Sequence, residues 1–327
     1  MHIFLFDLDG VLLNSAGYHR SLVETVRQLS LTLGFGDRGL TQAEIDAFES
    51  CDITAEWDSS ALCAALLLID AWAAGDDVSL PVGLPLGPAR PERHAFPDVL
   101  GFLAEFDGRV RADPLPEAES ILRRRLGRQD GDRVERVVSL LRDARRLEGS
   151  LTFRLVQLFN LGSRRFEEIY GEAAGIASPS FLETYDLPTL PEDERSKLFH
   201  ALSREGQAAA IVTNRPSTSP GSLFNTPEAE IGVRAAGFEQ LPRVAAGDLG
   251  WPALKMGRDV QTFLKPSPVH LLAGLRTALG DDRAAAVEMA IRLAQGSPTE
   301  PAWRELEGSR IALFEDAPKG HVSARAA

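Results

Sequence analysis

The feature that most constrains the fold is a short apolar run at the N-terminus that ends in acidic residues. Ile3 to Phe6 are all apolar, and Asp7, Leu8, Asp9 and Gly10 follow at once. A continuous apolar run of this length predicts a strand buried on both faces, as in parallel sheets covered by helices. Residues i and i+2 of a strand face the same way, so both aspartates are expected to point into one pocket.

Two more apolar runs, far along the chain, also end in polar residues. The residues that follow them are Thr213, Asn214 and Arg215 after Ala208 to Val212, and Glu315 and Asp316 after Ile311 to Phe314. A helical pattern from Glu192 to Glu205, with Gly206 as its expected C-cap, leads into the first of these runs. Ligands of open parallel sheets bind beyond the carboxyl ends of the strands, so the three polar tips are expected to form one site.

The long stretch between the first and second strands has a different pattern. From Ala16 to Asp186 the apolar spacing is helical, with one long segment from Arg133 to Phe159, and no strand-like alternation stands out. A chain of 327 residues also favours two domains over one core. The sequence therefore predicts an α/β core of residues 1–15 and 187–327, built as a three-layer Rossmann-like parallel sheet, and a helical insertion of residues 16–186.

Composition narrows the class of partner. The formal net charge of −12 and the pI near 5.1 argue against nucleic acid or an anionic membrane as a partner, because both need a basic surface. Cys51 and Cys63 form neither a disulfide framework nor a zinc spacing, so a reducing cytoplasm is expected. The longest apolar run, Ala61 to Ala74, is interrupted by Asp70 and too short for a membrane span. An anionic substrate of this acidic chain would need local positive charge, from a metal ion or a lysine at the site.

The chemistry of the expected site centres on Asp7 and Asp9. Two carboxylates about 4 Å apart repel by about 4 kcal/mol at an effective dielectric constant of about 20, and Glu315 and Asp316 would add to this. Mg²⁺ is the hard cation that prefers such oxygen ligands. Asp7 is then expected to attack phosphorus as a nucleophile, while Asp9 serves as general acid and base.

Three further groups are expected to bind the phosphate or to neutralise its charge. The Thr213 hydroxyl and the backbone N–H of Asn214 lie at a predicted strand tip, where they can donate to phosphate oxygens. Lys265, in the segment Phe-Leu-Lys-Pro-Ser-Pro, can neutralise the charge that develops in the transition state.

These motifs, in this order, resemble those of the haloacid dehalogenase-like superfamily, in the branch with a helical cap inserted after the first strand. The resembling segments are FDLDGVLLNS from Phe6, IVTNRP with Thr213, LKPSP with Lys265 and FEDAPKG with Glu315 and Asp316. The resemblance implies a hydrolase in which Mg²⁺ is bound by the Asp7 carboxylate, the Asp9 main-chain carbonyl and Asp316, with Glu315 in support. It also suggests that Arg215 contacts the substrate.

The resemblance has two departures. Asn14 stands where many capped relatives carry aspartate, which bears on the entry to the cap and not on the reaction. The chain also ends at Ala327, inside what resembles the helix after the fourth motif, so the core is expected to lack its last strand.

The leading hypothesis for function is a phosphatase that hydrolyses a small phosphorylated metabolite through an aspartyl-phosphate. Two alternatives stay open at this point. One is a sugar phosphomutase of the same superfamily, and the other is a binding or scaffold protein that keeps the motifs without activity.

Overall fold

The computed structural model divides the chain into two compact units, each described here by itself. The structure describes residues 1–107, 113–127, 131–146, 149–218, 225–297 and 301–327. One unit, the sheet unit, consists of Met1–Ser15 and Asp186–Ala327, and the other, the helical unit, is Ala16–Tyr185. The boundary after Tyr185 lies one residue before the expected one.

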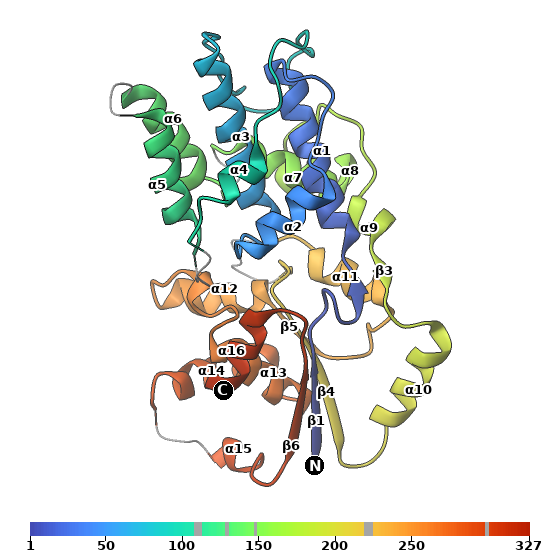
Figure 1. The fold of residues 1–327 in the computed structure, drawn as a ribbon. Helices are drawn as coiled ribbons and strands as arrows, with labels where there is room; N and C mark the ends of the chain where they lie inside the picture. Colours follow the sequence, from blue (N-terminus) through green and yellow to red (C-terminus); the bar gives the residue numbers. More distant parts are fainter. Residues whose placement is uncertain (108–112, 128–130, 147–148, 219–224, 298–300) are drawn as a thin grey trace. The chain divides into compact units, whose positions relative to one another are not determined.

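The sheet unit is built around four parallel strands in the order β5-β4-β1-β6 (Figure 1). Its elements are β1 His2–Phe6, β2 Leu13–Asn14, β3 Leu187–Pro188, α10 Glu192–Leu202, β4 Gln207–Thr213, α11 Glu228–Ala236, β5 Arg243–Ala245, α12 Ala246–Lys255, the 3-10 helix η1 Val260–Thr262, α13 Pro268–Ala278, α14 Arg283–Ala294, α15 Pro301–Arg304, β6 Arg310–Phe314 and α16 Pro318–Ala326. The predicted α/β fold with a parallel sheet is confirmed.

Both faces of the sheet are covered, which explains why the strands are apolar without alternation. On β1, Ile3 and Leu5 join a core with α12, α13 and α14. Phe4 and Phe6 face the other way and join a second core with α10 and α11. The period of two along one strand thus supplies both cores and gives three layers.

Helix α10 is shorter than the sequence predicts. It ends at Leu202 with Ser203 as its C-cap, and the N–H of Ser203 donates to the carbonyl of Phe199. Gly206 is not the cap; it has φ +77° and lies in the turn that leads to β4. Its backbone carbonyl accepts from the N–H of His2, so this turn is tied to the start of β1.

The segment where the chain leaves the sheet unit pairs with the segment where it returns. β2 and β3 form a small antiparallel ribbon in which Asn14 lies opposite Leu187 and Leu13 opposite Pro188. The Thr189 hydroxyl donates to the Val11 carbonyl at 2.6 Å. Asn14 therefore lies in the ribbon that joins the exit and the return of the chain.

The described residues of the helical unit form nine helices (Figure 1). These are α1 Ala16–Leu33, α2 Gln42–Ser50, α3 Glu56–Ala73, α4 Val99–Leu103, α5 Leu115–Leu126, α6 Gly131–Arg142, α7 Leu151–Leu161, α8 Ser163–Tyr170 and α9 Phe181–Tyr185. Helix α3 is buried on nearly all sides, and a partly buried ion pair joins its Asp58 to Arg145 at 2.6 Å. Across the described part of the chain, no helix has the length and apolar character to cross a membrane.

The predicted long helix from Arg133 to Phe159 is wrong, because the chain forms two helices there. Helix α6 ends at Arg142, and α7 begins at Leu151. Gly149 has φ +89°, which a helix does not contain, and the Ser150 side chain accepts from the N–H of Phe153 at 3.1 Å as an N-cap.

Candidate active site

The polar ends of β1, β4 and β6 meet at one edge of the sheet. Phe6 lies opposite Ile211 on one side and Phe314 on the other, and the backbone N–H of Asp7 donates to the Phe314 carbonyl at 2.9 Å. Because the three strands are parallel and paired in this register, the residues that follow each strand lie at the same level of the sheet. The meeting of the three tips follows the expectation from the sequence.

Asp7 is held in a buried position between two donors. Its Oδ1 accepts from the N–H of Leu8 at 2.8 Å and lies 3.0 Å from the ammonium of Lys265. Burial raises the pKa of Asp7 well above its usual value; Lys265 opposes this, while Glu315 and Asp9 add to it. The Asp7 carboxylate therefore has a fixed orientation, but the Lys265 ammonium does not offset the effects of burial and of the neighbouring acids on its pKa.

Three acids lie close enough to share a cation. One carboxylate oxygen from each of Asp7, Glu315 and Asp316 lies within 4.8 Å of the others. Burial, together with Glu315, raises the pKa of Asp316. Gly10 has φ +71°, and a side chain at that position would overlap the Asp316 carboxylate. The tight turn at Gly10, within the segment FDLDGVLLNS, is thus shaped around Asp316.

Lys265 links two of these acids. Its ammonium lies 2.6 Å from Oε2 of Glu315 and 3.0 Å from Oδ1 of Asp7, and its side chain is 4% exposed. Burial acts to lower the pKa of Lys265, but the two carboxylates outweigh it and the pKa is raised. The lysine follows η1 and comes just before α13, whose N-cap is Ser267.

Asp9 lies with a different set of partners. Arg215 donates from Nε to both carboxylate oxygens of Asp9 at 3.0 Å and from Nη2 to Oδ1 at 2.6 Å. The same Nη2 lies 2.9 Å from Oδ2 of Asp186. The Asp9 side chain is thus not among the three acids grouped around Asp7.

Arg215, which the sequence predicts to contact the substrate, follows the tip of β4 and pairs with two acids of the sheet unit. Its side chain is 2% exposed and is occupied by Asp9 and Asp186. The sequence did not single out Asp186, because an ion pair between residues 29 apart leaves no local pattern. Asp186 was notable only as the expected last residue of the insertion.

Thr213 is the last residue of β4 and Asn214 follows it, and the two residues differ in exposure. Thr213 is fully buried, and its hydroxyl oxygen accepts from the backbone N–H of Arg215 at 3.1 Å. A hydroxyl that accepts in this way can still donate its own hydrogen. Asn214 is exposed at the strand tip. Both groups lie where the sequence places the phosphate.

The donor set around Asp7 fits Mg²⁺. The three acids offer only oxygen, which hard divalent cations prefer, and one carboxylate oxygen of each lies within 4.8 Å of the others. The raised pKa values of Asp7 and Asp316 reflect burial and crowding that a cation would relieve. Asp7, Asp316 and Glu315 are the side chains that would hold it.

His270 of α13 gives the sheet unit a pH-dependent stability. Burial, with Lys265 nearby, lowers its pKa from 6.5 to about 3. Between pH 6.5 and pH 3, His270 therefore binds a proton in the unfolded chain but not in the folded chain. Its contribution to the free energy of unfolding is fully present above pH 6.5 and is lost as the pH falls toward 3. We expect a loss of about 2 kcal/mol at pH 5. Thermal unfolding of His270→Leu should lack this component, whereas the exposed His200→Leu should keep it.

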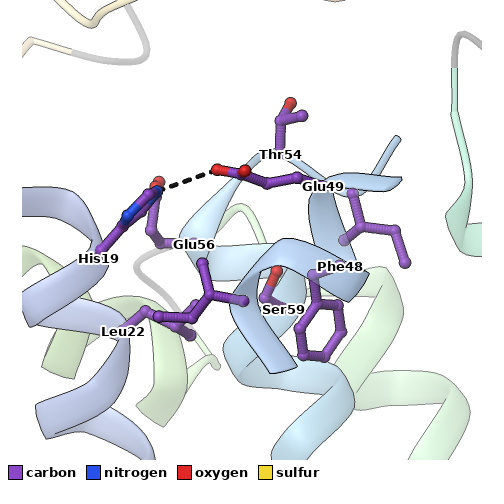
Figure 2. Close-up of a pocket in the computed structure, with 9 residues that line it drawn as sticks. His19, Leu22, Phe48, Glu49, Thr54, Glu56 and Ser59 are labelled. Carbon is purple, nitrogen blue, oxygen red and sulfur yellow. Dashed lines mark hydrogen bonds and ion pairs between the residues drawn. The ribbon is translucent and has the colours of Figure 1, made fainter. Parts of the chain in front are cut away.

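The helical unit contains a small pocket of its own. Figure 2 shows nine side chains around it, with His19 and Glu49 joined by a hydrogen bond of 3.0 Å. That bond raises the pKa of His19 against the effect of burial. The cavity volume is about 10 Å³, which is room for about one water molecule. This pocket is too small for a phosphorylated metabolite.

Comparison with known proteins concerns the fold. No protein-family model matches the sequence, and no curated protein gives a significant match. An X-ray structure of Northeast Structural Genomics Consortium target ZR25 is similar, with 19% identity, a TM-score of 0.64, and coverage of 100% of this chain and 88% of that one. Phosphatase Tt82 from Thermococcus thioreducens has 15% identity and a TM-score of 0.48, over 99% and 98% of the two chains. A TM-score below 0.5 does not establish a shared fold, so only the first similarity supports the α/β fold.

Proposed function

We propose that this protein is a Mg²⁺-dependent phosphatase of the haloacid dehalogenase-like type that hydrolyses a small phosphate monoester. One observation carries the proposal: Asp7, at the end of the central strand β1, is oriented by Lys265 beside two further acids. A buried, oriented carboxylate next to a fixed positive charge suits nucleophilic attack on phosphorus.

In the first step the Asp7 carboxylate attacks phosphorus. A bond forms between a carboxylate oxygen and phosphorus, and the bond from phosphorus to the ester oxygen breaks. Asp9 gives a proton to that oxygen, which leaves as an alcohol. The Thr213 hydroxyl, the Asn214 N–H and the Lys265 ammonium bind the phosphoryl oxygens.

In the second step water cleaves the aspartyl-phosphate. Asp9, now ionised, takes a proton from the water as its oxygen bonds to phosphorus, and the bond to Asp7 breaks. Inorganic phosphate leaves and both aspartates return to their starting states. When bound, Mg²⁺ would supply charge that lessens repulsion between the Asp7 carboxylate and the substrate phosphate.

The test is phosphate release by the purified chain from a panel of phosphorylated metabolites. We expect release with Mg²⁺ and a loss of at least about 100-fold with chelator, restored by added Mg²⁺. Acid quench during turnover of ³²P-labelled substrate should trap label on the protein in an acyl-phosphate linkage. Metal-independent release, or no label on the protein during turnover, would reject this mechanism.

A further inference from the structure

Arg215 offers a means to fix the direction of the Asp9 carboxylate. Its guanidinium binds Asp9 on one side through Nε and Nη2 and Asp186 on the other through Nη2. Exposure of the side chains rises along this series, from 0% for Asp186 to 2% for Arg215 and 33% for Asp9. Only the last member of the series is accessible, so the arginine can act on a substrate only through Asp9.

The backbone around Arg215 is fixed as well. Its N–H donates to the Thr213 hydroxyl at 3.1 Å, and its carbonyl accepts from the N–H of Ala246 at 3.1 Å. On the helix that follows, a side chain at Gly232 would overlap the guanidinium, so α11 packs directly on it. A planar guanidinium held in this way offers its donors to Asp9 in one geometry.

We infer that Arg215 and Asp186 are positioning residues, which hold the Asp9 carboxylate in the orientation needed to transfer a proton to the leaving oxygen. The inference rests on the proposed function. Nη2 makes the shorter contact with Asp9, and it goes to Oδ1, whereas Oδ2 shares only the Nε hydrogen. Oδ2 is therefore the oxygen placed to exchange a proton.

The experiment compares two substrates that differ in their need for a proton. p-Nitrophenolate leaves phosphorus readily without one, whereas an alkoxide does not. We expect Arg215→Lys, which keeps the charge and loses the two-point contact, to lower kcat/KM for an alkyl phosphate by about 100-fold. For p-nitrophenyl phosphate the loss should be within about 3-fold. Asp186→Asn should give the same selectivity with a smaller loss of about 10-fold.

Arg276 of α13 supplies a matched control. It is similarly buried in the sheet unit and binds two acids and a carbonyl, Asp281, Glu305 and Ala302. Arg276→Lys should lower the Tm much as Arg215→Lys does, but should leave the ratio of the two kcat/KM values unchanged. A loss of kcat/KM in Arg215→Lys that is equal for both substrates, or no loss, would overturn the positioning role.

A separate readout distinguishes failure of this inference from failure of the proposed function. If the wild-type protein releases phosphate from neither substrate, the proposed function fails. The contact between Asp9 and Arg215 is then tested by thermal unfolding of Asp9→Asn, Arg215→Lys and the double variant. A shift in Tm for the double variant that is smaller than the sum of the two single shifts supports the coupling. Additive shifts in Tm would overturn the coupling between Asp9 and Arg215, whether or not the protein releases phosphate.

Discussion

Asp7→Asn is expected to lower phosphate release by about 10⁴-fold or more, because the amide cannot form the acyl-phosphate. The folded protein should survive the change. Burial raises the pKa of Asp7, so the folded chain holds the ionised carboxylate at a cost in free energy, and a neutral amide of the same shape removes that cost. The Tm of the metal-free variant should equal or exceed that of the wild type while activity is lost.

The control for this change is Asp193→Asn. Asp193 belongs to the same unit, but its side chain is 70% exposed and pairs with Lys197 on the surface of α10. This variant should keep full activity. Equal phosphate release from Asp7→Asn and the wild type would reject Asp7 as the nucleophile, and a large fall in Tm would attribute the lost activity to folding.

The sheet and its polar edge could be predicted because each strand carries its own signal. Ile3 to Phe6 and Ala208 to Val212 are continuous apolar runs, and parallel pairing brings their polar ends to the same level. The short β5, Arg243–Ala245, was not predicted, since three residues carry too little pattern. The same holds for the two-residue strands of the β2–β3 ribbon.

The partners within the site could not be predicted in the same way. Sequence order placed Lys265 near Asp7, but its ion pair with Glu315 depends on how the segment before α13 packs. Arg215 was expected to contact the substrate because the Thr-Asn-Arg-Pro segment resembles that of phosphatases with an arginine near the substrate. Its burial between Asp9 and Asp186 depends on contacts with α11 and the returning chain, which no local pattern encodes.

Lys265→Met is expected to affect both stability and activity. The change leaves the Glu315 side chain, 1% exposed, and the Asp7 carboxylate without their shared ammonium. Removing one partner of a buried ion pair costs about 3–5 kcal/mol, which for a unit of this size lowers the Tm by roughly 10 °C. Phosphate release should fall by about 10²–10³-fold, because the developing charge loses its fixed counter-charge.

Added Mg²⁺ separates the electrostatic cause of this loss from a packing cause. If the destabilisation arises from unpaired carboxylates, Mg²⁺ should raise the Tm of Lys265→Met more than that of the wild type, because a cation replaces the missing charge. Lys197→Met is the control, because it removes a lysine from an exposed ion pair, in which the Lys197 and Asp193 side chains are 75% and 70% exposed. It should shift neither the Tm nor the response of the Tm to Mg²⁺. A Tm of Lys265→Met that Mg²⁺ leaves unchanged would mean that the three acids do not bind the cation together.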